Sequence, residues 1–345
     1  MYEIDFLPVE NEDRDSSKSG DAIAMRFTAP DGSGPYIVAI DGGFTPVGGE
    51  LADHIETYYG TTKIDLVIST HPDTDHLNGL LTLLERCDVT ELLMHLPWKH
   101  SNRAKDMGNY ERIRAVYDLA VSKNVLVSEP FTGDTRLQGA ISILGPTKEF
   151  YSTQLATSID ETSSASFSAR SLGSTLLAKA TKVLERVLSY FPSETLSDAD
   201  ETSARNKTSV ITLLRTEGYS ALFTGDAGIP SLEAATLEYE RIVGEFRHSP
   251  VSLFQAPHHG SHRNVGPTIL NKILGTPDAP FGGTNAIVSS AKASEKHPSP
   301  KVTNALGRRG AKVSATEGKT ICYSDTHRPG WSATTPIAPL EEDDE

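Results

Sequence analysis

The sequence has few cysteines and no long apolar run. Cys87 and Cys322 are the only cysteines among 345 residues, and neither belongs to a Cys-x-x-Cys pair. Two isolated thiols in unrelated contexts indicate reduced, buried side chains rather than a disulfide. No apolar stretch approaches the roughly 20 residues that a helix needs to span a bilayer. The opening MYEIDFLPVENEDRDSSKSG has neither the basic nor the apolar region of a signal peptide, so we expect a cytoplasmic protein without membrane contact.

Positive charge is also in short supply. The chain has 46 acidic residues against 32 Lys and Arg, which gives a formal net charge of -14. Proteins that bind duplex nucleic acid without regard to sequence usually carry a basic face, because neutralising phosphates drives that affinity. The charge balance therefore excludes broad coating of nucleic acid, while a local basic groove remains compatible with it.

Two common catalytic motifs are missing. The sequence contains no Gly-rich phosphate loop of the GxxxxGK[ST] type, so nothing supports work driven by nucleotide hydrolysis. It also lacks the GxSxG turn that presents a serine nucleophile, since GSGPY at 32–36 does not match that pattern.

The apolar pattern predicts strands that alternate with helices. In the first half it predicts strands over 22–30, 35–43, 63–70 and 90–97, helices over 47–59 and 109–124, a helix that begins near His76, and a hairpin over 135–147. In the second half it predicts strands over 208–215, 219–226, 252–257 and 285–290, helices over 230–244, 265–274 and 300–309, and one closing strand over 312–324. These elements indicate an α/β fold.

Residues 152–205 differ from the rest in being rich in Ser, Thr, Ala and acidic residues, which predicts an insertion. Within it, leucines and valines at helical spacing predict an amphipathic helix over 171–191. We expect this helix to pack on the core, with a lid or a surface for a protein partner as the alternative. The chain is thus expected to form a single domain over 1–335, followed by an acidic disordered tail over 336–345.

The stretch LVISTHPDTDHLNG carries the densest chemistry. A buried apolar run ends, and His71, Asp73, Asp75 and His76 follow within six positions. Zn²⁺ accepts imidazole and carboxylate ligands together, and Mn²⁺ tolerates a carboxylate-rich set. Asp75 and His76 are adjacent, so their side chains diverge and can face two different ions. The alternative is a helix N-cap, but a cap needs only one aspartate.

Two other predicted strands end in residues that can bind metal. ALFTGDAG ends a strand at Asp226 between glycines, and FQAPHHGSH ends another at His258 and His259. Sites in layered α/β proteins are commonly built where strands end. Asp226 alone would suit a simple turn, but three clusters of the same ligand chemistry indicate one metal centre.

The motifs AIDGG, STHPDTDH, LFTGD and APHHGS, in this order, resemble the metallo-β-lactamase superfamily. More narrowly, the chain is similar to the soluble domain of the DNA-uptake protein ComEC and its stand-alone relatives. That subgroup has HPDxDH, an Asn-containing segment that corresponds to RNKTSVITLL here, and a later His-Pro element. The likeness runs from about Val9 to Tyr323, except over 152–200. It implies a four-layer αββα sandwich with a metal centre at one edge.

The resemblance also implies the ligands of a first divalent ion. They would be Asp75, His76, Asp226 and one of His258 and His259. His258 is preferred because it comes first after the strand.

A second ion would be bound by His71 and Asp73, with Asn206 standing where most of the superfamily has a third histidine. Asp41 in AIDGG corresponds to a residue that supports the site. Asp73 replaces a histidine and Asn206 is a feeble ligand. This second site is therefore expected to be weak, to favour Mn²⁺, or to fill only with substrate.

The chemistry that follows is hydrolysis. Two ions can share a water and lower its pKa, and the resulting metal-bound hydroxide attacks a phosphoryl or carbonyl centre. Asp75 is expected to act as ligand and proton acceptor. Asn206, Ser209 or His297 would hold the oxygens of the substrate.

The leading interpretation is a metal-dependent phosphodiesterase or nuclease that uses one or two Zn²⁺ or Mn²⁺ ions. The net charge favours a nucleotide or single-stranded nucleic acid as the substrate. One alternative is a hydrolase of a carboxylic ester, lactone, amide or thioester. The other is a metal-bound sensor that binds a partner, with the 152–205 insertion as a candidate contact.

Overall fold

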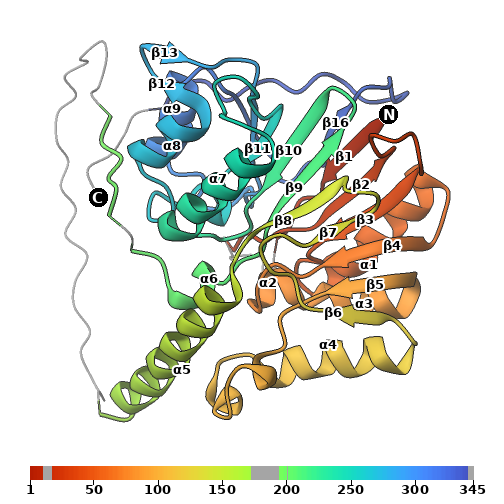
Figure 1. Ribbon diagram of the computed structural model, residues 1–345, viewed down its shortest axis with the longest axis vertical. Helices are drawn as coiled ribbons and strands as arrows, with labels where there is room; N and C mark the ends of the chain where they lie inside the picture. The colour runs from red at the N-terminus through yellow and green to blue at the C-terminus, as the bar shows by residue number, and fades with distance from the viewer. Residues whose placement is uncertain (11–17, 172–193, 200, 341–345) are drawn as a thin grey trace.

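The computed structural model describes residues 1–10, 18–171, 194–199 and 201–340, which form two seven-stranded sheets packed face to face (Figure 1). The first sheet has the order β16-β1-β2-β3-β4-β5-β6. Its strands are β1 (Tyr2–Phe6), β2 (Ile23–Phe27), β3 (Tyr36–Ile40), β4 (Lys63–Ile68), β5 (Asp88–Leu93), β6 (Leu126–Ser128) and β16 (Ile321–Ser324).

The second sheet has the order β15-β14-β11-β10-β9-β8-β7. Its strands are β7 (Thr135–Arg136), β8 (Ile141–Gly145), β9 (Ile211–Thr216), β10 (Tyr219–Phe223), β11 (Leu253–Gln255), β14 (Asn285–Val288) and β15 (Lys312–Ala315). The two sheets follow the same plan, since each combines antiparallel strands with four neighbouring parallel ones: β3 to β6 in the first, and β10, β11, β14 and β15 in the second. A small hairpin of β12 (Gly275–Thr276) and β13 (Ala279–Pro280) lies apart.

Helices cover the outer face of each sheet. On the first sheet lie α1 (Thr45–His54), which continues into the π-helical η1 (Ile55–Tyr59), α3 (Gly79–Arg86), α4 (Tyr110–Ser122) and the start of α5 (Lys148–Ser171). On the second lie α7 (Ile229–Ile242), α8 (Pro267–Leu274) and α9 (Pro300–Arg308). Short turns of helix are α2 (Thr74–Leu77), α6 (Ala204–Lys207), η2 (Pro97–Lys99), η3 (Ala104–Asp106) and η4 (His258–Gly260).

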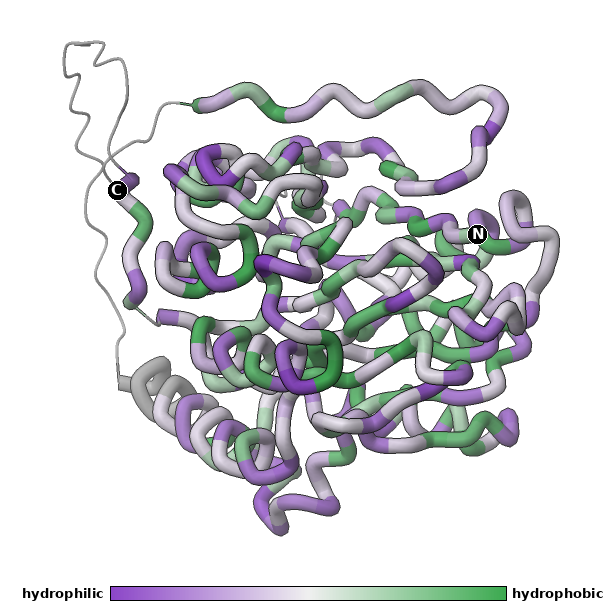
Figure 2. Tube along the Cα trace, turned by 45° about the horizontal axis from the view of Figure 1, so that its top comes forward, coloured by the Kyte–Doolittle hydropathy of each residue, from purple (hydrophilic) through white to green (hydrophobic). Residues whose placement is uncertain are grey.

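The strands have apolar side chains on both faces. In β3, Val38 and Ile40 lie in the core between the sheets, whereas Ile37 and Ala39 lie in the core under the helices. Successive side chains of a strand point to opposite faces, so a strand covered on both sides becomes a continuous apolar run. Figure 2 shows many hydrophobic residues through the middle of the molecule, while the helices outside carry hydrophobic and hydrophilic residues in alternation. The predicted α/β fold of four layers, αββα, is confirmed.

The last strand prediction was wrong. The stretch 312–324 forms two strands, β15 in the second sheet and β16 in the first. Between them the backbone turns, with Lys319 N donating to Thr316 O at 2.8 Å and Gly318 at a φ of 80°. The sequence also missed β1, which pairs with β16 and β2.

The 152–205 insertion is partly integrated into the fold. Helix α5 begins at Lys148, and its side chains Tyr151, Leu155 and Ile159 lie in the core on the first sheet. The helix predicted over 171–191 lies outside the described residues except at Ser171.

The C-terminal segment contacts the rest of the fold further along the chain than the sequence predicted. A disordered tail was expected over 336–345, but residues 336–340 contact the second sheet and α9. Ile337 N donates to Val313 O at 2.8 Å, and Leu340 N donates to Asn304 Oδ1 at 3.0 Å. Residues 341–345 lie outside the described part of the chain.

Two predictions concern features elsewhere in the chain. Cys87 and Cys322 are both free thiols, as predicted, with Cys87 buried and Cys322 partly exposed. None of the helices in the described ranges has both the length and the apolar character needed to cross a membrane.

Candidate metal centre

The predicted ligands lie in loops at one edge of the two sheets. His71 to His76 follow β4, Asp226 follows β10, and His258 and His259 follow β11. Strands β10 and β11 are parallel neighbours, so their carboxyl ends meet at the same edge of the second sheet. The first sheet therefore contributes one half of the cluster and the second sheet the other.

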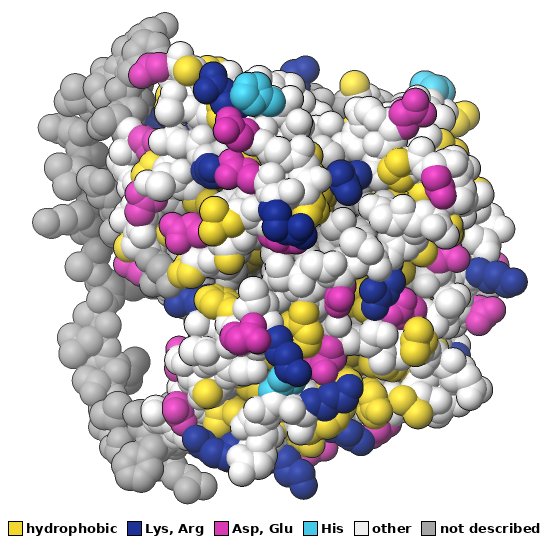
Figure 3. All heavy atoms as spheres, in the orientation of Figure 1, with side chains coloured by type: hydrophobic (Ala, Val, Ile, Leu, Met, Phe, Trp, Pro, Cys, Tyr) yellow, Lys and Arg dark blue, Asp and Glu magenta, His cyan; other side chains and the backbone are white. Residues whose placement is uncertain are grey.

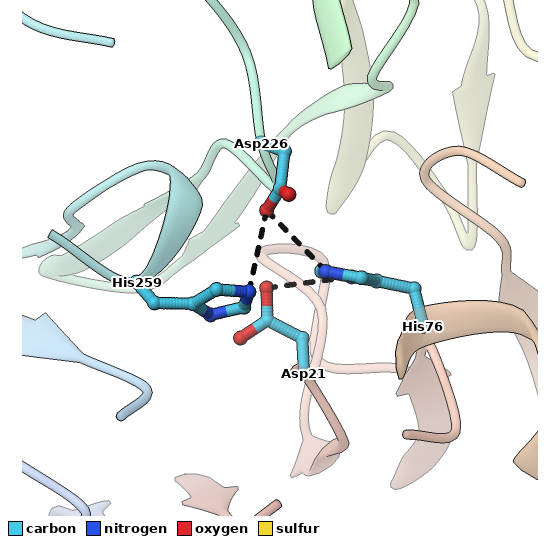
Figure 4. A group of neighbouring side chains, drawn as sticks. All are labelled: Asp21, His76, Asp226 and His259. Carbon is cyan, nitrogen blue, oxygen red and sulfur yellow. Dashed lines mark ion pairs between the residues drawn. The ribbon is translucent and has the colours of Figure 1, made fainter. Parts of the chain in front are cut away.

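Asp226 lies between two sets of side chains. Its Oδ1 is 3.3 Å from His76 Nε2 and 3.8 Å from His259 Nε2. His259 Nε2 is in turn 3.7 Å from Asp75 Oδ2. We call His76, His259 and Asp75 the Oδ1 group. Figure 4 shows Asp226 pointing at both of these histidines.

The other oxygen of Asp226 faces a second set. Asp226 Oδ2 is 3.5 Å from His71 Nε2 and 3.6 Å from His258 Nε2. His71 Nε2 is 3.8 Å from Asp73 Oδ2. We call His71, His258 and Asp73 the Oδ2 group. Each oxygen of Asp226 is thus accompanied by two imidazoles and one further carboxylate.

These atoms are suited to binding a cation. Asp226, His71, His76 and His259 are all buried. Asp226 Oδ1 and the Nε2 atoms of the three histidines are buried without a hydrogen-bond partner in the described residues. Buried polar atoms are normally paired, because leaving them unpaired costs free energy. A divalent ion that accepts nitrogen and oxygen ligands would satisfy them.

Charge holds Asp226 in its ligand form. Burial alone favours the neutral acid, but the nearby His258, His76, His71 and His259 keep the pKa of Asp226 well below its usual range. In the Oδ1 group burial likewise opposes ionisation. The nearby imidazoles of His259, whose Nε2 is 3.7 Å from Asp75 Oδ2, and of His76 nevertheless lower the pKa of Asp75 to about 2. Both carboxylates are therefore ionised at neutral pH.

Asp41 orients two of the histidines. Its Oδ2 is 2.7 Å from His76 Nδ1 and accepts from Thr70 Oγ1 at 2.5 Å. Because the Thr70 hydroxyl donates to Asp41, its oxygen is left to accept from His71 Nδ1 at 3.0 Å. With an ion bound, both rings would keep their proton on Nδ1 and turn the lone pair of Nε2 toward the ion beside Asp226. Such support is what metal-binding histidines generally need.

Asn264 orients His258, and no sequence motif marked it. Its Nδ2 donates to the carbonyl oxygens of Asp226 at 2.9 Å and Ala227 at 3.2 Å, which fixes the amide. Its Oδ1 then faces His258 Nδ1 at 2.9 Å and accepts from it. Asn206 was expected near the ion, but its Nδ2 is instead 3.3 Å from this same Nδ1, the ring nitrogen of His258 that does not face Asp226.

The two adjacent histidines face different groups because of the backbone. His258 and His259 have φ values of 50° and 55°, in the left-handed region that non-glycine residues rarely adopt. The sequence preferred His258 as the partner of Asp75 and His76, but the structure places His259 there. His258 lies on the side of His71, so both histidines belong to the cluster.

Asp21 is a further carboxylate that the sequence did not indicate. One oxygen or ring nitrogen from each of Asp21, His76, Asp226 and His259 lies within 4.8 Å of all the others (Figure 4). Asp21 Oδ2 accepts from Gln255 Nε2 at 2.9 Å, and Asp21 Oδ1 has no partner among the described residues. It comes just before β2, where a lone aspartate has no recognisable spacing.

Two residues predicted to hold substrate oxygens differ in placement. Ser209 is fully buried, and its hydroxyl oxygen accepts from Asp226 N at 3.2 Å. It therefore fixes the backbone of the loop that carries Asp226. His297 lies beside the cluster, with its ring centre 5.8 Å from that of His258. Burial and the neighbouring His259 and His258 lower the pKa of His297 to about 3, so its ring is neutral.

Comparison with known proteins gave the following matches. Residues 37–158 match the model of the family described as the Metallo-beta-lactamase superfamily. Among solved structures, the metallo-beta-lactamase fold protein YhfI from Bacillus subtilis is 10% identical, covers 94% of this chain and 100% of its own, and has a TM-score of 0.46. A diphosphatase from the PhnP family is 12% identical, and the match covers 94% of this chain and 98% of the diphosphatase, with a TM-score of 0.42.

A third structure, the diiron beta-hydroxylase CmlA from Streptomyces venezuelae, is 13% identical over 92% of this chain and 46% of its own, with a TM-score of 0.39. No curated protein sequence matches the chain. Residues 37–158, less than half of the chain, are therefore similar to the metallo-beta-lactamase superfamily, and the two sheets covered by helices on their outer faces have the four-layer arrangement expected from the sequence.

Proposed function

We propose that the protein is a metal-dependent hydrolase of phosphodiesters, in a nucleotide or a single-stranded nucleic acid. The observation that supports this most is the division of the two Asp226 oxygens between the Oδ1 group and the Oδ2 group. A carboxylate shared by two sets of ligands suits a pair of divalent ions, the arrangement that many enzymes of phosphate chemistry use.

The groups on both sides of Asp226 would hold the ions. His76, His259 and Asp75 would bind one, and His71, His258 and Asp73 the other, with Zn²⁺ or Mn²⁺ as the metal. When bound, such ions lower the pKa of a water molecule and neutralise charge on phosphoryl oxygens. Zn²⁺ suits the imidazoles, while the carboxylates in each group also admit Mn²⁺.

The chain itself supplies proton acceptance and positive charge. Asp75 remains ionised and its side chain is 26% exposed, so it can accept a proton from the attacking water. Arg205 Nε lies 2.5 Å from Asp73 Oδ1 and brings a permanent charge to the Oδ2 group. A guanidinium there favours an anionic substrate such as a phosphodiester. His297 would contact a substrate oxygen through its neutral ring.

The surface favours a small or single-stranded substrate. On the described part of the face in Figure 3, Lys and Arg side chains are interspersed with Asp and Glu and form no large basic patch. Together with the net charge of -14, this disfavours binding of long duplexes through their phosphates. The likeness of the HPDTDH and HHGS motifs to the ComEC subgroup supports the diester chemistry.

The test is the hydrolysis of bis(p-nitrophenyl) phosphate and p-nitrophenyl acetate by protein stripped of metal and reloaded with Mn²⁺ or Zn²⁺. We expect metal-dependent turnover of the diester that Asp226→Ala lowers by more than about 100-fold, because both ion sites lose a ligand. Asp88→Ala, at an exposed aspartate that starts β5, is the matched control and should keep full activity.

The other outcomes separate the alternatives. Turnover of the carboxylic ester alone would replace the diester proposal with the ester or lactone hydrolase. No turnover of either compound with either ion would leave a metal-bound sensor or partner-binding role.

A further inference from the structure

An apolar cavity lies beside the metal centre. Its empty volume is about 440 Å³, which includes space open to solvent. The walls come from the loop after β4, the end of β5, and helices α4, α5 and α6. Several elements that are distant in the sequence therefore converge on one space at the same edge of the first sheet.

Apolar side chains form most of the wall. Met94, Met107, Ile113 and Leu155 all line it and are themselves buried. Their methyl and methylene groups offer no hydrogen bonds, so the space suits an apolar group of a ligand.

The imidazole of His95, one of the rings in the wall, is uncharged. His95 stacks on Tyr151 with ring centres 4.1 Å apart. Burial, together with the nearby His100, lowers the pKa of His95 to about 3. The backbone of Thr208 raises this pKa, but by less than burial lowers it. At neutral pH the imidazole therefore adds no charge to the cavity.

The cavity and the metal centre share residues. His71 lines the cavity, and its Nε2 faces Asp226 Oδ2 at 3.5 Å. Arg205 also lines the cavity, and its Nε contacts Asp73 of the Oδ2 group. Among the described residues that line the cavity, Arg205 is the only Lys, Arg, Asp or Glu, and therefore brings the permanent charge.

We propose that this cavity binds an uncharged, apolar ester group of the substrate while the phosphoryl group lies at the Oδ2 group. The inference rests on the proposed phosphodiesterase function and narrows the class of substrate. The substrate class becomes phosphodiesters that carry an alkyl or similarly apolar ester group. Arg205 would face the anionic phosphoryl oxygen, and the apolar walls would enclose the substituent, where a charged group would lose its hydration without gaining hydrogen bonds.

The experiment compares p-nitrophenyl diesters of phosphate whose second ester group is methyl, butyl or hexyl, with the metal-reloaded protein. Each methylene that enters the cavity should raise kcat/KM by roughly threefold to fourfold until the space is full. A rate that does not rise with chain length in the wild type would overturn the inference while turnover itself upholds the proposed function.

Two variants on α5 locate the effect. Ser158 is buried and lines the cavity, whereas its neighbour Thr157 is exposed on the same helix. Ser158→Leu should abolish the gain with chain length and leave the methyl ester within about threefold of the wild type. Thr157→Leu, which places the same leucine side chain outside the cavity, should behave as the wild type. Equal chain-length gains in both variants would contradict this placement.

A binding measurement keeps the inference testable apart from turnover. Calorimetric titration with methyl phosphate and hexyl phosphate should show that the wild type binds hexyl phosphate at least about tenfold more tightly, and that Ser158→Leu does not. That result without diester hydrolysis would support the cavity and remove the proposed function. Equal affinity for the two phosphates in the wild type would remove the cavity proposal, whatever the turnover.

Discussion

Asn264 determines which ring nitrogen of His258 faces Asp226. Its amide nitrogen is committed to the carbonyl oxygens of Asp226 and Ala227, which can only accept. Its oxygen must therefore accept from His258 Nδ1, which keeps the lone pair on Nε2. Asn264 is fully buried, so no water can readily take over this bond.

Asn264→Ala should weaken binding of the ion at the Oδ2 group by about 10–100-fold, the usual effect of removing a partner that orients a ligand. Titration with Mn²⁺ or Zn²⁺ measures the loss, and the ¹⁵N shifts of the His258 ring report the tautomer. Asn102→Ala, at an exposed position, is the control. Unchanged affinity together with an unchanged tautomer would show that Asn264 has no positioning role.

The residues that the sequence could identify are those with a compact pattern. His71, Asp73, Asp75 and His76 stand within six positions, and His258 and His259 are adjacent. Asp21 had no such pattern, because its partner Gln255 is 234 positions away. Asn264 and Arg205 were missed for a related reason, since neither is recognisable until the loops come together.

Helices α1 and α3 approach so closely that glycines are required between them. A Cβ at Gly48 would overlap with the carbonyl oxygen of Gly79, and a Cβ at Gly79 would overlap with that of Gly42. Gly79 begins α3, directly after the His76 segment, and Gly42 follows Asp41. The contact therefore holds the first-sheet half of the metal centre in place.

Gly48→Ala should lower the free energy of unfolding by about 1–3 kcal/mol, because the new methyl group meets backbone that cannot move aside. Gly49→Ala in the same helix has no atom closer than 3.6 Å and should instead raise it by up to about 1 kcal/mol. Chemical denaturation of both variants measures the difference. Equal effects of the two substitutions would mean that α1 can shift freely over α3.

Elements with strong apolar patterns were predictable, and those that depend on distant partners were not. In β1, Glu3 and Asp5 alternate with Ile4 and Phe6, so the strand looks polar on one face. Those carboxylates are buried because Arg328 pairs with both of them from beyond β16. Similarly, nothing local in 312–324 tells that β15 and β16 join different sheets.

In the molecule as a whole, the metal centre joins the two halves of the fold. Asp41 and the His71–His76 segment come from the first sheet, whereas Asp226, His258 and His259 come from the second. The core between the sheets combines side chains of both, among them Phe6 and Phe223, whose ring centres are 6.1 Å apart. The position of Asp226 between the Oδ1 and Oδ2 groups therefore depends on how the two sheets pack.

The most direct test of this account is anomalous diffraction from crystals of the chain grown with Zn²⁺ or Mn²⁺. We expect at least one anomalous peak next to Asp226, with the peak on the Oδ1 side bound by His76, His259 and Asp75. A second peak on the Oδ2 side would lie near His71, His258 and Asp73. Crystals that show no peak within coordination distance of Asp226 with either metal would contradict the assignment of this cluster as a metal centre.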